Sequence, residues 1–223
     1  MVYYDDATAD KRPGVMVVHE WWGLNDYAKH RAEMLAKLGY VALACDMYGD
    51  AKNTEHPEDA RKMAPEVRMN KDVWMGRANA GLKVLKDHKV CDPKKLAVMG
   101  YCFGGTTSLN IALAGTEDVL AVVSFHGALP APTADEVKKV KAKVVVCHGA
   151  DDPFIPADAV AKFKKAFDDA GVKYTFEAYP GAVHSFTVKD SEKKMLTGMA
   201  YNQAADEKSW ATMQAAFKEV FGK

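Results

Sequence analysis

The sequence carries no net charge and no long apolar run. Thirty basic side chains balance thirty acidic ones over 223 residues, so there is no positive excess to attract nucleic acid or an anionic membrane surface. No apolar run approaches the roughly 20 residues that span a bilayer, and Met1–Asp10 lacks the basic and apolar regions of an export signal. We therefore expect a cytoplasmic protein with a small-molecule partner, unless a segment with an export signal precedes this sequence.

Cysteines are few, and they lack the spacing of a metal site or a disulfide framework. Cys45, Cys91 and Cys147 lie in or beside apolar runs, which is typical of buried free thiols in a reducing compartment. No CxxC or Cys/His ligand pattern is present, so we expect neither a metal nor a cofactor. The fourth, Cys102, differs because glycines flank it.

The composition fits one folded domain. With 48% hydrophobic residues in 223, the chain can bury a full core, and one large α/β unit of this length is ordinary. The sequence has no internal repeat, linker or low-complexity tract. We expect a single domain over residues 1–223, as a monomer or a small homo-oligomer.

Short apolar segments alternate with longer amphipathic ones. Near-continuous apolarity indicates strands buried on both faces of a parallel sheet; these segments are 15–20, 40–48, 95–102, 119–127, 143–152 and 174–181. Helical periodicity covers about 25–38, 72–88, 103–115, 156–170 and 203–221. The alternation predicts an α/β fold with a doubly wound, mostly parallel sheet flanked by helices.

Two regions stand outside this alternation. Residues 1–14 offer at most one short strand, so we expect the sheet to lack some N-terminal strands that related folds carry. Residues 49–71 are polar and contain Pro57 and Pro65. We expect this stretch to be a surface excursion with short helices, close to the strand ends where α/β folds bind ligands.

Cys102 occupies the pattern G-x-C-x-G, between an apolar strand and a helical segment. That context is typical of a nucleophile elbow, a sharp turn that holds the reactive atom in strained backbone geometry. The N-terminus of the helix favours a thiolate, and the amide of Phe103 could bind a developing oxyanion. The alternative is a glycine-rich turn whose cysteine is merely small.

A carboxylate and a histidine follow later strands, in the order that this chemistry requires. Asp151 and Asp152 end one apolar strand, and His184 lies in the loop after the next. The histidine can take the thiol proton while a carboxylate fixes its tautomer. We predict that Asp152 is this carboxylate, because Asp151 could equally cap the turn.

Other polar residues near strand ends leave two interpretations open. Glu20 ends a buried run and either forms structural hydrogen bonds or bonds the resting Cys102 thiol. His126 and His148 follow strands and could line a pocket. His19 is expected to pack beside its strand.

Five motifs together make the sequence similar to the dienelactone hydrolase family of the α/β-hydrolase superfamily, over essentially its whole length. They are HEWWGLN (19–25), GYVALACDMYGD (39–50), GYCFGG (100–105), GADDPFIP (149–156) and GAVHSF (181–186). The resemblance implies an α/β-hydrolase fold and a catalytic triad of Cys102, Asp152 and His184. It also implies that Glu20 holds the resting thiol.

The same resemblance implies further site residues and one departure. The amides of Phe103 and Trp21 would form the oxyanion hole, and Trp21 and Trp22 would line the acyl pocket. Enzymes that hydrolyse dienelactone carry an arginine four residues after the histidine, but here that position is Val188, followed by Lys189. Arg61 and Arg68 are the nearest candidates for a second family arginine, so the substrate is not fixed by the motifs.

These observations predict a cysteine hydrolase of small carboxylic esters or lactones. One alternative keeps the triad but acts on thioesters or organophosphate triesters. Another is a non-catalytic binding or thiol-redox protein that retains the fold.

Overall fold

The computed structural model describes residues 1–194 and 196–222. Within these residues, seven strands form one sheet in the order β1-β3-β2-β4-β5-β6-β7. β1 pairs antiparallel with β3, and every other neighbouring pair of these strands is parallel. The strands are β1 (Val2–Tyr3), β2 (Arg12–Val18), β3 (Val41–Cys45), β4 (Cys91–Tyr101), β5 (Val119–Phe125), β6 (Lys143–Gly149) and β7 (Tyr174–Tyr179). The predicted α/β fold with a mostly parallel sheet is confirmed, and one short strand precedes β2 as expected.

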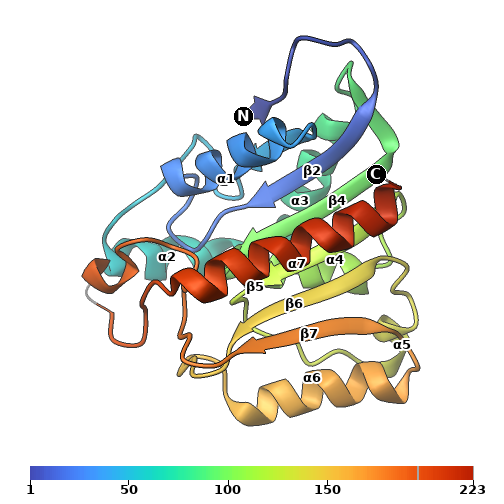
Figure 1. Ribbon diagram of the computed structural model, residues 1–223. Coiled ribbons are helices and arrows are strands. Elements are labelled where there is room, and N and C mark those ends of the chain that lie inside the picture. Colours follow the sequence, from blue (N-terminus) through green and yellow to red (C-terminus); the bar gives the residue numbers. More distant parts are fainter. Residues whose placement is uncertain (195, 223) are drawn as a thin grey trace.

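Helices cover both faces of the sheet (Figure 1). One face packs against α1 (Asp26–Lys37) and α7 (Gln203–Phe221). The other packs against α3 (Lys71–Lys86), α4 (Phe103–Leu113) and α6 (Ala157–Asp169). The remaining helices are α2 (Pro57–Arg68), the short α5 (Ala134–Val137) and the 3-10 turn η1 (Ser191–Lys194). Among the described residues, no helix combines the length and the apolarity that crossing a membrane requires.

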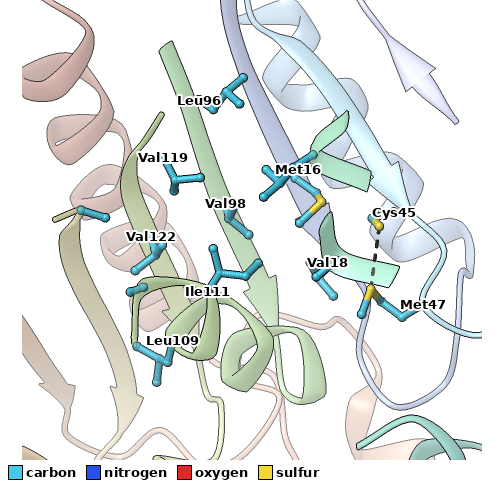
Figure 2. Close-up of a cluster of buried hydrophobic side chains, with 14 of the residues drawn as sticks. Met16, Val18, Cys45, Met47, Leu96, Val98, Leu109, Ile111, Val119 and Val122 are labelled. Carbon is cyan, nitrogen blue, oxygen red and sulfur yellow. Dashed lines mark hydrogen bonds between the residues drawn. The ribbon is translucent and has the colours of Figure 1, made fainter. Parts of the chain in front are cut away.

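Each central strand contributes side chains to both cores. In β2, Val15 and Val17 pack on the α1 and α7 side, while Met16 and Val18 pack on the α4 side. Figure 2 shows this second cluster, in which Met16 and Val18 lie near Val98 and residues of α4. Successive strand residues point to opposite faces, so a strand covered on both sides must be apolar throughout.

The excursion at 49–71 is more regular than its sequence suggests. The sequence predicts short helices here, but α2 is a twelve-residue helix that runs through Pro65. Pro57 begins it, where a missing N–H costs no hydrogen bond. This helix lies close to the carboxyl ends of the strands, and it contributes both arginines of the cavity described below.

Candidate active site

Cys102 lies at the sharp turn between β4 and α4. Its backbone has φ 53° and ψ −113°, a conformation that non-glycine residues rarely adopt. Two hydrogen bonds hold it there: the Cys102 N–H donates to the Phe125 carbonyl (3.0 Å), and the Thr106 N–H donates to the Cys102 carbonyl (3.1 Å). The thiol is partly exposed, so this turn presents it at the start of α4.

Two glycines allow α4 to approach the sheet at this turn. A Cβ on Gly104 would lie 2.2 Å from the carbonyl oxygen of Val18, and a Cβ on Gly100 would lie 2.2 Å from the carbonyl oxygen of Gly104. Both contacts are with backbone atoms, which cannot move aside as a flexible side chain can. The glycines therefore let the helix start directly against the end of β2, which brings the β2 loop close to Cys102.

His184 and Asp152 form a buried pair at the same edge of the sheet. Asp152 follows β6 and His184 follows β7, and His184 Nδ1 lies 2.7 Å from Asp152 Oδ2. The other carboxylate oxygen accepts a hydrogen bond from the Phe154 N–H at 2.8 Å. With Nδ1 bonded to the carboxylate, Nε2 is the nitrogen left to exchange a proton with a substrate or a nucleophile.

Charge around His184 favours its protonated form. Burial lowers its pKa, but the electrostatic interaction with Cys102 and the hydrogen bonds to Asp152 and Cys102 outweigh burial and raise the pKa to about 10. Near neutral pH, this environment therefore favours the imidazolium form of His184.

Asp151 has a different partner from its neighbour. Its exposed carboxylate accepts a hydrogen bond from the Gly181 N–H at 3.0 Å. This bond ties the loop after β6 to the loop after β7. The structure thus pairs Asp152, and not Asp151, with His184.

Glu20 is buried and links two loops of the site. Only 2% of its surface is exposed, and Oε1 accepts a hydrogen bond from Ser185 Oγ at 2.7 Å. Ser185 follows His184 directly and has a left-handed backbone, with φ 52°. Glu20 therefore helps to fix the loop that carries His184. Its bond to the resting thiol stays a prediction.

A cavity of about 400 Å³ opens beside Cys102 and His184. Its walls are mainly apolar and aromatic, and α2 adds two arginines. The described lining residues are Trp21, Arg61, Ala64, Arg68, Trp74, Cys102, Phe103, Thr106, Ala128, Phe154, Ile155, His184, Leu196 and Met199. Trp21, Arg61 and Arg68, which are expected in the pocket, line this cavity. Their contact with a substrate stays a prediction.

Three other expected pocket residues lie outside this lining. Trp22 is almost fully buried against Ala60 and Met199. His126 has no exposed surface, and its ring contacts the ring of His184 edge-on, with centroids 5.1 Å apart. Lys189 borders a separate cavity of about 640 Å³ that it shares with α1 residues. Their positions follow from the turn geometry after each strand, which sequence spacing does not specify.

Two aromatic residues that line the cavity are not among the pocket residues predicted from the sequence. Trp74 of α3 stacks on Phe103, with ring centroids 5.5 Å apart, and donates its indole N–H to Thr107 Oγ1 at 2.8 Å. Phe154 is half exposed and meets His184 edge-on at 5.2 Å. Phe154 could have been found, because it lies in the same motif as Asp152. Trp74 carries no such signal, because an aromatic residue in an amphipathic helix is usually a core residue.

The two amides expected to form an oxyanion hole belong to Phe103 and Trp21. Phe103 begins α4, and Trp21 lies in the loop after β2. Within residues 1–194 and 196–222, neither amide donates to a protein acceptor. The Tyr48 hydroxyl donates a hydrogen bond to the Trp21 carbonyl at 2.9 Å.

No cluster of three or more metal-ligating side chains occurs among the residues that the structure describes.

Comparison with known proteins places these features in context. The model of the dienelactone hydrolase family matches residues 1–221. Protein usf of Aquifex pyrophilus is 31% identical over 211 residues, which are 93% of this chain and 88% of that protein. The crystal structure of a dienelactone hydrolase-like promiscuous phosphotriesterase from metagenomic libraries superposes with a TM-score of 0.94 at 36% identity. It covers 98% of this chain and 91% of the other.

A more distant structure shares the fold alone. MGS-M1, an alpha/beta hydrolase enzyme from a Medee basin deep-sea metagenome library, superposes with a TM-score of 0.74 at 19% identity. It covers 100% of this chain and 92% of the other.

Proposed function

Because this chain belongs to the dienelactone hydrolase family of α/β hydrolases, we propose that it cleaves small carboxylic esters or lactones with Cys102 as its nucleophile. One observation carries the proposal: a thiol on a strained turn shares a cavity with a histidine whose Nδ1 is bonded to a buried carboxylate. This is the arrangement of nucleophile, base and orienting group that covalent acyl transfer requires.

In the proposed reaction, substrate displaces the Cys102 thiol from Glu20, and His184 accepts the thiol proton as the sulfur attacks the carbonyl carbon of the ester. The carbonyl oxygen becomes an oxyanion, which accepts hydrogen bonds from the amides of Phe103 and Trp21. When the tetrahedral intermediate collapses, the ester C–O bond breaks and protonated His184 gives its proton to the leaving alkoxide. An alcohol and a thioester acyl-enzyme result.

Water completes the turnover. Neutral His184 accepts a proton from a water molecule as that water attacks the thioester carbonyl. The second tetrahedral intermediate expels the Cys102 sulfur, which takes back the proton from His184, and the products are a carboxylic acid and the restored thiol beside neutral His184. For a lactone, the alcohol and the acid belong to one hydroxy acid. Asp152 orients His184 in both steps, and Glu20 is proposed to hold the thiol before substrate arrives.

The cavity supports a small substrate with one apolar part and one anionic part. Trp21, Trp74 and Phe154 offer apolar and aromatic surface, while Arg61 and Arg68 offer positive charge to a carboxylate or a phosphate. Position 188 is a valine, and Lys189 borders another cavity. We therefore do not propose dienelactone itself as the preferred substrate.

A second candidate activity is phosphotriester hydrolysis. It is favoured by the likeness to the promiscuous phosphotriesterase at 36% identity over 98% of this chain. The same thiolate and the same oxyanion hole would serve a phosphoryl centre.

A substrate panel tests both activities. We expect measurable kcat/KM for neutral and anionic p-nitrophenyl esters and for lactones, higher for the anionic members, and a loss of about 10⁴-fold or more in Cys102→Ala. A phosphotriester preferred over every ester would favour the second candidate. Turnover that is unchanged in Cys102→Ala would refute the proposed mechanism.

A further inference from the structure

His19 is a buried histidine to which the proposed mechanism gives no role. It lies directly after β2, and none of its surface is exposed. It does not line the cavity beside Cys102 in the described part of the chain. Its two ring nitrogens nevertheless both contact backbone groups, and these contacts converge on the loop that carries Trp21.

The partners of His19 fix its tautomer. The Met47 N–H donates to His19 Nε2 at 3.1 Å, so Nε2 must be unprotonated. The ring proton therefore lies on Nδ1, which donates it to the Glu20 carbonyl oxygen. The Gly23 N–H donates to the same oxygen at 3.2 Å.

The acceptor of this bond is half of the peptide group that supplies the Trp21 amide. The Glu20 carbonyl and the Trp21 N–H belong to one planar trans peptide, so they point in opposite directions. A donor held against the carbonyl therefore fixes the direction of the N–H. A hydrogen bond to the carbonyl also polarises the peptide and makes its N–H a stronger donor.

The ring of His19 also contacts the other half of the proposed oxyanion hole. It stacks on Phe103, with centroids 5.9 Å apart and an interplanar angle of 15°. Tyr48 meets it edge-on at 4.7 Å. The start of α4 is equally close to its backbone, because a Cβ on Gly104 would lie 2.8 Å from the His19 carbonyl oxygen. His19 thus touches both segments whose amides would bind the oxyanion.

Burial keeps this ring neutral. It lowers the pKa of His19 to about 4, although the bond to the Glu20 carbonyl and the nearby Asp46 carboxylate both act to raise the pKa. A neutral ring can accept from Met47 and donate to Glu20 at the same time, whereas an imidazolium could not accept.

We propose that His19 is a positioning residue of the oxyanion hole, which aligns and polarises the Trp21 amide through the carbonyl of the same peptide group. This inference rests on the proposed function, because it presumes that an oxyanion forms next to Cys102. If it is correct, replacing His19 slows the attack of Cys102 on a carbonyl group but does not slow reactions of the thiol that form no oxyanion.

Two reactions of Cys102 separate these effects. Acylation by p-nitrophenyl acetate passes through an oxyanion, whereas alkylation by iodoacetamide displaces iodide from a saturated carbon and forms none. The variants are His19→Gln, whose longer amide can still accept from Met47, and His19→Asn, whose amide nitrogen can replace Nδ1 as the donor to Glu20. Tyr48→Phe is the matched control, because it removes a hydrogen bond from the carbonyl of the next peptide.

We expect His19→Gln to slow acylation about 10- to 100-fold and to leave alkylation close to the wild-type rate. His19→Asn should recover most of the acylation rate, and Tyr48→Phe should lose less than His19→Gln. If His19→Gln does not fold, His19→Leu fills the buried site without either bond and gives the same comparison.

Three results would overturn the inference. Acylation and alkylation could fall together in His19→Gln, acylation could stay at the wild-type rate, or Tyr48→Phe could be as slow as His19→Gln. A wild-type protein that alkylates but is never acylated at Cys102 would instead refute the proposed function, and the role of His19 with it.

Discussion

Asp151 and Asp152 are adjacent acids with different partners. Asp152 is buried and contacts His184, while Asp151 is exposed and accepts a bond from the Gly181 backbone. The two positions therefore form a matched pair, in which the same chemical change removes either the carboxylate bonded to His184 or the carboxylate bonded to the Gly181 backbone.

We expect Asp152→Asn to lower kcat/KM for a p-nitrophenyl ester by about 10²- to 10⁴-fold, because the amide can no longer stabilise the His184 imidazolium or fix the tautomer of the neutral ring. Asp151→Asn should leave kcat/KM nearly unchanged. Steady-state kinetics on both variants checks this. Equal losses would mean that the loop, and not the carboxylate on His184, accounts for the effect.

At the residue scale, the sequence predicts which residues lie together better than it predicts where each side chain points. The places of Cys102, Asp152 and His184 after strands predict that they lie together, and the structure brings them together. Trp21 and Trp22 are adjacent tryptophans. In the described part of the chain, Trp21 lines the cavity beside Cys102, whereas Trp22 is buried in a small apolar cluster. Lys189 faces another cavity. The turn after a strand decides where each side chain points, and the pattern of residue types does not encode that turn.

At the scale of elements, the start of α4 is the critical junction. It packs against the end of β2 so closely that only glycine fits at position 104. Gly76 on α3 offers the contrast, because it is exposed and a Cβ there would meet no atom within 4 Å.

Gly104→Ala should therefore destabilise the protein by about 1–3 kcal/mol and also lower kcat, because the helix must shift away from β2 and carry Cys102 with it. Gly76→Ala should stabilise it by about 0.5–1 kcal/mol, since alanine favours the helix and restricts the unfolded chain. Urea unfolding measures both. A Gly104→Ala variant with wild-type stability and kcat would contradict the close packing.

The elements themselves were largely predictable from the sequence. Apolar runs marked the strands because both faces of the sheet are covered, and amphipathic periods marked the helices that cover them. Helix α2 was harder to foresee, because its polar sequence and Pro65 argue against a continuous helix. Its residues Ala64 and Val67 are buried in the same core as residues of α3, and this burial stabilises a helix that its local sequence does not favour.

At the scale of the whole molecule, buried neutral histidines couple stability to pH. The pKa of His19 is lowered by burial to about 4, from an ordinary value of 6.5. Between these values the unfolded chain binds a proton that the native protein excludes, so stability falls as the pH falls from 6.5 towards 4. Burial also lowers the pKa of His126, so protonation of His126 in the unfolded chain lowers stability in the same way.

His19 alone should cost the native state about 2–3 kcal/mol at pH 4.5 relative to pH 7. His19→Asn removes the titrating group, so it should lose less stability over this interval than the wild type does. His30→Asn, at an exposed position of α1, is the control and should behave like the wild type. Urea unfolding at the two pH values decides, and equal losses in the wild type and His19→Asn would contradict a neutral buried ring.

The central claim is that Cys102 carries the acyl group during hydrolysis. The most direct measurement is mass spectrometry of the protein quenched during turnover of a slowly hydrolysed activated ester, followed by peptide mapping. We predict one added acyl group, located on the peptide that contains Cys102 and absent from Cys102→Ala. An acyl group on another residue, or full hydrolysis by Cys102→Ala with no acyl-enzyme, would contradict the account.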